Sequence, residues 1–341
     1  MKIAVVGAGA IGAYWGAALH RGGADVHLIA RNDNLRAIRE NGVRVLSPRG
    51  DFLAHPHATD SPAEIGPVDY IFLGLKAHSY PTCGPLIEPL LGPDTAIVAA
   101  QNGIPWWYFH GLSGPYQGHR IEAVDPGGAT SAVLAPERAI GCVVYPATVL
   151  EAPGVVRHLE GTRFSIGEPS GELSERCRLL SDAMIAGELK CPVEPDLRND
   201  IWIKLMGNVA FNPLSALTRS TMVQMCQDPN TRQVVIQLME ETLDVAARLG
   251  STPEISIEKR LRGAENVGYH KTSMLQDLEA GKQLELDAIV SAVVELADLT
   301  GAAAPTLRTV HAATGLLAHA SGVAPSRSGG NSQQQPQAAL R

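Results

Sequence analysis

The chain has 341 residues, of which 45% are hydrophobic and 18% charged, enough apolar material for two domains. Its net charge of −7 disfavours nucleic acid and anionic membranes as partners, and no apolar run reaches the roughly 18–20 residues of a membrane span. The five cysteines are scattered without a C-x-x-C pair, so we expect reduced thiols, a cytoplasmic protein and no metal site.

The first predicted elements are a strand, a glycine-rich turn and a helix. Residues 3–6 are apolar and mostly β-branched, which predicts a buried parallel strand, and residues 13–19 predict a helix of small residues. Between them stand Gly7, Gly9 and Gly12 at G-x-G-x-x-G spacing. These glycines allow a tight turn, close approach of the backbone to a pyrophosphate, and close helix–strand packing. The pattern predicts a dinucleotide site, and the alternative is a glycine-rich turn in another α/β protein.

The second predicted strand, residues 25–30, decides which dinucleotide is expected. An NAD site places Asp or Glu at the end of this strand, where it accepts a hydrogen bond from the ribose 2′-hydroxyl. This chain has Arg31 there, whose guanidinium matches a 2′-phosphate. We therefore predict NADP(H). In the alternative interpretation Arg31 points to solvent and Asp33 serves an NAD site one position late.

The rest of the first half continues to alternate strands with helices, which predicts a parallel, doubly wound sheet. Two strong strand patterns end at Lys76 and at Gln101-Asn102-Gly103. Ligands bind beyond the carboxyl ends of such strands, so we expect Lys76 and Asn102 near the cofactor. The alternatives are a solvated lysine and a turn-forming Asn-Gly pair. Further predicted elements are helices at 34–41 and 172–186, a strand pair at 43–45 and 52–54, and strands at 69–75, 95–100, 140–145, 154–159, 163–166 and near Val193.

Beyond Pro195 the strand patterns stop and long helical periods follow, at residues 201–211, 231–249 and 284–299. The predicted fold class is α/β, with an N-terminal Rossmann-type parallel-sheet domain followed by an all-helical C-terminal domain. We place these domains at residues 1–197 and 198–320. Residues 321–341 are rich in Ser, Gly, Gln and Pro, so we expect a disordered tail.

The helix predicted at the start of the second domain carries unexpected polar residues. Lys204, Asn208 and Asn212 stand at i, i+4 and i+8 on an otherwise apolar helix. Burying them costs several kcal/mol unless they find partners, and a keto acid substrate would supply partners. Desolvation would lower the pKa of Lys204 and make it a better proton donor. Pro213 predicts a bend near Asn212. A structural polar network between helices is the alternative.

These residues together resemble the ketopantoate reductase (2-dehydropantoate 2-reductase) family. The resemblance covers about residues 1–318 and rests on GAGAIG at 7–12, Arg31, Lys76, QNG at 101–103, KLMGNVAFNPLSAL at 204–217 and SMLQDLEAGKQLELD at 273–287. It implies reduction of 2-dehydropantoate to (R)-pantoate by NADPH, with Lys204 as catalytic proton donor. It further implies that substrate is bound by Asn102, Asn208, Asn212 and Ser273, and cofactor by Gly7, Ala8, Gly9, Ala10, Ile11, Gly12, Arg31, Lys76, Asn102, Ala147 and Glu285.

Two features of the sequence bear on these implied roles. An unbroken helix would separate Ser273 from Glu285 by about 18 Å, so both face one cleft only if the helix breaks, for which Gly281 is the candidate. Between 104 and 133 the chain departs from the family's compact members and inserts four aromatics, 106–109. They would roof the substrate cleft, form a subunit contact or pack as a surface loop.

The predicted function is thus NADPH-dependent reduction of ketopantoate in pantothenate biosynthesis. The alternatives are a paralogous reductase of another bulky 2-keto acid and a catalytically silent NADPH-sensing protein. The expected partner is a small-molecule 2-keto acid, with neither nucleic acid nor membrane, and a homodimer is the assembly we consider.

Overall fold

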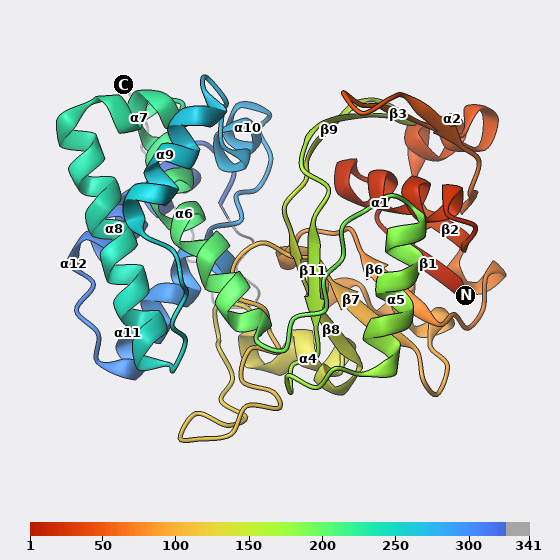
Figure 1. The fold of residues 1–341 in the computed structure, drawn as a ribbon, viewed down its shortest axis with the longest axis horizontal. Coiled ribbons are helices and arrows are strands. Elements are labelled where there is room, and N and C mark those ends of the chain that lie inside the picture. The colour runs from red at the N-terminus through yellow and green to blue at the C-terminus, as the bar shows by residue number, and fades with distance from the viewer. Residues whose placement is uncertain (325–341) are drawn as a thin grey trace, which may run out of the picture.

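A computed structural model describes residues 1–324, which form a sheet-containing region and a helical region side by side (Figure 1). The strands all lie before residue 168, and the chain is helical from α6 onward. This order confirms the predicted fold class. No helix among the described residues is both long and apolar enough to cross a membrane.

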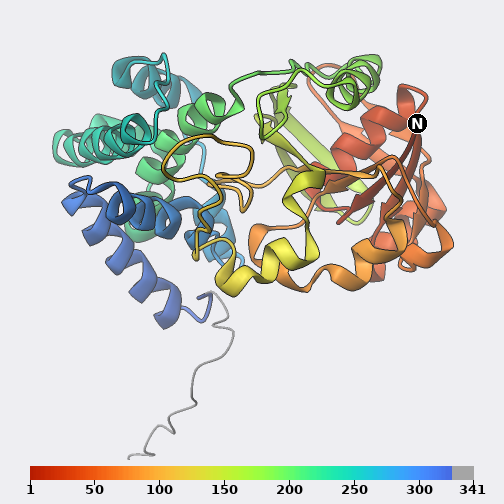
Figure 2. The same cartoon turned by 90° about the horizontal axis from the view of Figure 1, so that it is seen from below.

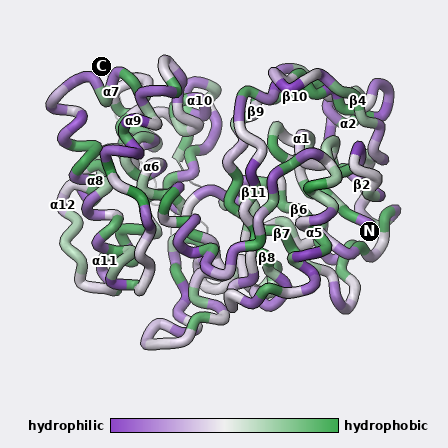
Figure 3. The backbone as a smooth tube through the Cα atoms, in the orientation of Figure 1, coloured by the Kyte–Doolittle hydropathy of each residue, from purple (hydrophilic) through white to green (hydrophobic). Residues whose placement is uncertain are grey.

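The main sheet has seven strands in the order β11-β8-β7-β6-β1-β2-β5. All neighbours are parallel except β11, which runs antiparallel to β8. The central strands are buried along their whole length, and Figure 3 shows them as hydrophobic. The strands are β1 Lys2–Val6, β2 Asp25–Ile29, β5 His57–Thr59, β6 Tyr70–Leu73, β7 Ala96–Ala99, β8 Ala139–Val144 and β11 Phe164–Gly167.

A second sheet of four strands, which the sequence analysis did not predict as a unit, packs on helix α1. The Tyr14 ring of α1 stacks on His158 of this sheet, with ring centroids 4.7 Å apart. The edge strand β9 has four exposed residues out of six, so it lacks the apolar pattern that reveals a strand. The strands are β3 Val43–Leu46, β4 Phe52–Ala54, β9 Ala147–Ala152 and β10 Val155–Glu160.

The helices of the sheet region are α1 Ala10–Arg21, α2 Asn32–Asn41, α3 Gly84–Ile87, α4 Ala129–Val133 and α5 Glu175–Ala186. Those of the helical region are α6 Leu197–Thr218, α7 Met222–Gln227, α8 Pro229–Arg248, α9 Ile257–Val267, α10 Ser273–Glu279, α11 Ala292–Thr300 and α12 Pro305–Ala320. A π-helical turn, Asp287–Ser291, precedes α11.

Two expectations about local structure need correction. The strand expected near Val193 is reduced to an isolated bridge with Ile166. The helix is also not interrupted near Asn212, where a bend is expected, because α6 continues through the buried Pro213. Proline removes one backbone hydrogen bond, and the packing of α6 against α8 and α10 compensates for this loss.

The predicted tail, 321–341, lies mostly outside the described residues. Of its first residues, Val323 is buried, and its carbonyl accepts a hydrogen bond from the Leu284 N–H at 3.2 Å.

The chain between β7 and α4 joins the two regions. The Ile104 N–H donates to the carbonyl of Ala288 at 2.8 Å, and the backbone N–H groups of Glu122 and Ala123 donate to the Glu295 carboxylate at 2.7 and 2.9 Å. Figure 2 shows this segment lying among the helices of the second region. The loop that carries Asn102 is therefore anchored on both sides.

Candidate active site

The glycine-rich turn has the geometry that a pyrophosphate cradle requires. Gly7 has φ +98°, a conformation that favours glycine. A β-carbon at Gly12 would collide with the Gly7 carbonyl oxygen, whereas one at Gly9 would meet no protein atom within 4 Å. Helix α1 begins at Ala10 without a side-chain cap or an acidic residue in its first turn. Its free N–H groups and the open space at Gly9 fit a phosphate.

Arg31 is exposed at the N-cap of α2 and makes no side-chain hydrogen bond or ion pair with a described residue. Asp33, the competitor for an NAD site, is instead paired with Arg36 at 2.6 Å. The neighbouring Asn34 donates to the Ala8 carbonyl at 2.7 Å and so ties α2 to the glycine turn. This arrangement leaves a cation, rather than a carboxylate, available beside the end of β2.

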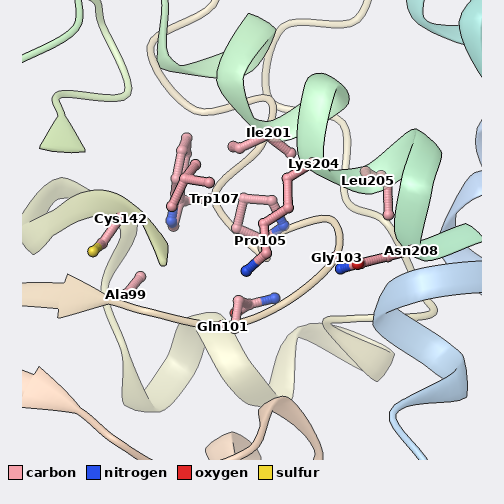
Figure 4. Close-up of a pocket in the computed structure, with 11 residues that line it drawn as sticks. Ala99, Gln101, Gly103, Pro105, Trp107, Cys142, Ile201, Lys204, Leu205 and Asn208 are labelled. Carbon is pink, nitrogen blue, oxygen red and sulfur yellow. The ribbon is translucent and has the colours of Figure 1, made fainter. Parts of the chain in front are cut away.

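Lys204 extends from α6 toward the loop after β7, as Figure 4 shows. Its ammonium donates to Asn102 Oδ1 at 2.7 Å and to the Val144 carbonyl at 2.6 Å. An ammonium has three donors, so one remains for another acceptor. The cavity at this point is lined by Ala99, Gln101, Gly103, Pro105, Trp107, Cys142, Val143, Ile201, Lys204, Leu205 and Asn208.

Two titratable groups at this site, Lys204 in the cavity and Glu285 beside Asn102, have shifted pKa values. Burial lowers the pKa of Lys204 from 10.5 to about 8, against the opposing effect of the Glu285 charge. Burial also raises the pKa of Glu285, against the effects of Lys76 and of the Asn102 amide, which donates to Glu285 at 3.3 Å. Lys204 is thus poised to give up a proton near neutral pH.

The structure brings Asn102, Lys204, Asn208 and Glu285 together at the junction of the two regions. Asn212 follows one turn later on α6 and is 5% exposed. Ser273 is exposed in the first turn of α10, a helix that packs on α6. The predicted break at Gly281 is confirmed, since α10 ends at Glu279 and Gly281 has φ +63°.

Lys76, expected near the cofactor, forms a 2.5 Å ion pair with Asp277 of α10 and so bridges the regions. Ala147 begins β9 in the sheet that packs on α1. Sequence reasoning missed Asp277, which only the docking of α10 brings to Lys76, and it missed Arg260, whose side chain lies against Gly207 of α6. No local pattern distinguishes either residue from a surface charge.

The four inserted aromatics, Trp106, Trp107, Tyr108 and Phe109, are all at most 5% exposed. They therefore form neither a surface loop nor a contact surface for another subunit. Trp106 donates to the Leu134 carbonyl at 2.9 Å, and Tyr108 accepts from Trp202 at 2.8 Å. Trp107 alone of the four borders the Lys204 cavity. The four aromatics are thus core residues, and one of them lies at the candidate site.

Comparison with known proteins places these observations in a family. Residues 3–106 match the family described as ketopantoate reductase PanE/ApbA, and residues 196–318 match its C-terminal part. The chain is 48% identical to a 2-dehydropantoate 2-reductase of Mesorhizobium japonicum, over 93% of this chain and 98% of that protein.

Two solved structures share the fold along nearly their whole length. A putative ketopantoate reductase from Ralstonia solanacearum is 34% identical, with a TM-score of 0.89 over 94% of this chain and 99% of that one. A 2-dehydropantoate 2-reductase from Geobacter metallireducens is 31% identical, with a TM-score of 0.81 over 93% and 100%.

Proposed function

Since the chain belongs to the ketopantoate reductase PanE/ApbA family, we propose that it reduces 2-dehydropantoate to (R)-pantoate with NADPH, a step of pantothenate biosynthesis. The observation that carries this proposal is Lys204. It is a largely desolvated lysine with a pKa of about 8 and one ammonium donor to spare, held at the carboxyl edge of the parallel strands, the edge that also carries the glycine turn.

NADP(H) is the proposed cofactor of this NAD(P)H-dependent family. The glycine turn (Gly7 to Gly12) would hold the pyrophosphate, and Arg31 would hold the 2′-phosphate, because a free guanidinium matches it and Asp33 is already paired. The resemblance adds Lys76, Asn102, Ala147 and Glu285 to the residues around the cofactor. When bound, NADPH supplies the hydride for C2 of the keto acid.

The chain's own residues supply the proton and the orientation. Lys204 donates a proton to the carbonyl oxygen as that oxygen gains charge, and the product is a 2-hydroxy acid. Asn102 accepts from the ammonium and Val144 fixes its second donor, so the third is directed at the substrate. Asn208, Asn212 and Ser273 are proposed to bind the remaining polar groups of the substrate.

The test is NADPH oxidation with a panel of 2-keto acids, using wild type and Lys204→Ala. Ketopantoate should be the best substrate. Loss of a general acid typically lowers the rate about 10²- to 10⁴-fold, so the variant should be nearly inactive while its Kd for NADPH stays within about twofold. Unchanged turnover in Lys204→Ala would contradict the mechanism.

A second candidate function is reduction of a bulkier or more aromatic 2-keto acid. It is favoured by Trp107, which borders the cavity. Faster turnover of such an acid than of ketopantoate would support it. A third candidate, an NADPH sensor without turnover, would bind NADPH and reduce no member of the panel.

We also propose a cytoplasmic site of action, since Cys83, Cys142, Cys177, Cys191 and Cys226 are all buried free thiols. The homodimer stays a prediction, which sedimentation at micromolar concentration would test. Neither proposal affects the chemistry assigned to the cavity.

A further inference from the structure

Arg260 of α9 lies directly against the helix that carries Lys204. A β-carbon at Gly207 would stand 2.7 Å from the Arg260 guanidinium carbon and closer still to two of its nitrogens. Glycine at position 207 therefore makes room for this guanidinium on the surface of α6. Position 207 lies three residues after Lys204, so the contact lies within one helical turn of the lysine.

The guanidinium has no partner among the described residues. Its Nε is buried without a hydrogen-bond acceptor, and the side chain forms no hydrogen bond or ion pair with residues 1–324. The carboxylates of Glu194 and Asp200, which act on the neighbouring Tyr145, both pair with Arg163 instead. Arg260 is half-buried and its Nε fully buried, and leaving a cation without a partner there is costly, so a missing anionic partner is the simplest explanation.

Arg260 is also electrostatically coupled to Lys204. Its positive charge adds to the effect of burial in lowering the pKa of Lys204, and burial lowers the pKa of Arg260 itself. A bound anion between the two would relieve both effects. A 2-keto acid carries its carboxylate on the carbon next to the carbonyl, so a group that binds it must lie beside the proton donor. Arg260 contacts α6 one helical turn from Lys204.

We propose that Arg260 binds the carboxylate of the 2-keto acid and thereby sets the specificity for acids over neutral carbonyl compounds. This inference rests on the proposed function, because it assumes that Lys204 protonates the neighbouring carbonyl. The planar fork of the guanidinium holds a carboxylate by two parallel hydrogen bonds. Gly207 is then a specificity-determining position, since any side chain there displaces the fork.

The test compares a 2-keto acid with its own primary amide, which keeps the carbonyl and loses the charge. In Arg260→Gln, kcat/KM for the acid should fall about 10- to 100-fold, the range for loss of a charge-assisted hydrogen bond. The value for the amide, or its inhibition constant if it is not reduced, should change less than threefold. Arg260→Lys, which keeps the charge but not the fork, should show a smaller loss for the acid.

Matched controls lie on α9, the helix that carries Arg260. Arg262 is exposed, and Gly263 has open space around its Cα, so Arg262→Gln and Gly263→Ala should leave both constants unchanged. Gly207→Ala should reproduce the acid-selective loss without removing any charge. NADPH Kd and thermal unfolding, measured for each variant, report on cofactor binding and folding separately.

Equal losses for acid and amide in Arg260→Gln would overturn the inference and assign Arg260 a purely structural role. A parallel rise in the Kd for NADPH would overturn it in favour of a cofactor contact. Failure of the wild type to reduce any 2-keto acid would instead overturn the proposed function, and the inference with it.

Discussion

The glycine turn and the Lys204 cavity are built in opposite ways. At the turn, the backbone forms the site, and side chains are excluded: a β-carbon at Gly12 meets the Gly7 carbonyl, and the first turn of α1 carries no acidic residue. At the cavity, side chains form the site, and Lys204, Asn102 and Glu285 come from parts of the chain up to 183 residues apart.

This difference separates what a local pattern encodes from what tertiary packing encodes. The turn depends on six consecutive residues, and its fold leaves no room for a β-carbon at Gly12. The cavity depends on the docking of α6, the loop after β7 and the segment before the π-helical turn. Substitutions at the turn should therefore affect folding or cofactor binding, and those at the cavity should affect chemistry.

The largest effect on the turn is expected from Gly12→Ala. Its β-carbon would strike the backbone oxygen of Gly7, which cannot move without distorting the turn, and overpacking of this kind costs about 3 kcal/mol. Chemical denaturation should show that loss.

The matched variant is Gly9→Ala, whose β-carbon would meet no protein atom within 4 Å. The free energy of unfolding of this variant should change by less than about 0.5 kcal/mol. Its binding of NADPH should weaken about tenfold or more, because the β-carbon occupies the space of the pyrophosphate. Equal stability of the two variants would contradict the account.

Removal of Arg31 should have an intermediate effect confined to one cofactor. Arg31→Gln should raise the Kd for NADPH about 10- to 100-fold, because charge-assisted hydrogen bonds to the 2′-phosphate are lost. Binding of NADH should stay the same. Arg36→Gln, which breaks only the exposed pair with Asp33, is the control and should change neither constant. Parallel weakening of both cofactors would refute the 2′-phosphate role.

The smallest effect is expected at the bridge between the regions. Asp277→Asn removes the ion pair with Lys76, whose side chain is 34% exposed. Such a pair contributes about 0.5–1 kcal/mol, so thermal unfolding should shift by a few degrees at most. Asp244→Asn, which breaks the exposed pair with Arg248 on one helix, is the control and should shift less. A larger shift in the control would mean that the bridge does not join the regions.

Sequence reasoning identified the turn and Lys204 because their signals are local: glycine spacing, and a lysine on an apolar helix. It predicted a bend at Asn212 because a proline follows, yet α6 continues through Pro213 as one helix. It could not find Arg260, since α9 also carries the exposed Arg262 two residues later. Only the approach of α9 to Gly207 distinguishes the two arginines.

The central claim, that Lys204 is the proton donor of the cavity, is tested most directly by the pH profile of kcat/KM for ketopantoate reduction. A donor must be protonated, so the rate should be constant below the pKa of about 8 and fall about tenfold per pH unit above it. In Glu285→Gln the pH at which kcat/KM begins to fall (the break of the profile) should be lower, because the Glu285 charge raises the pKa of Lys204. A wild-type profile that stays flat to pH 9.5, or a break that moves upward in Glu285→Gln, would contradict the account.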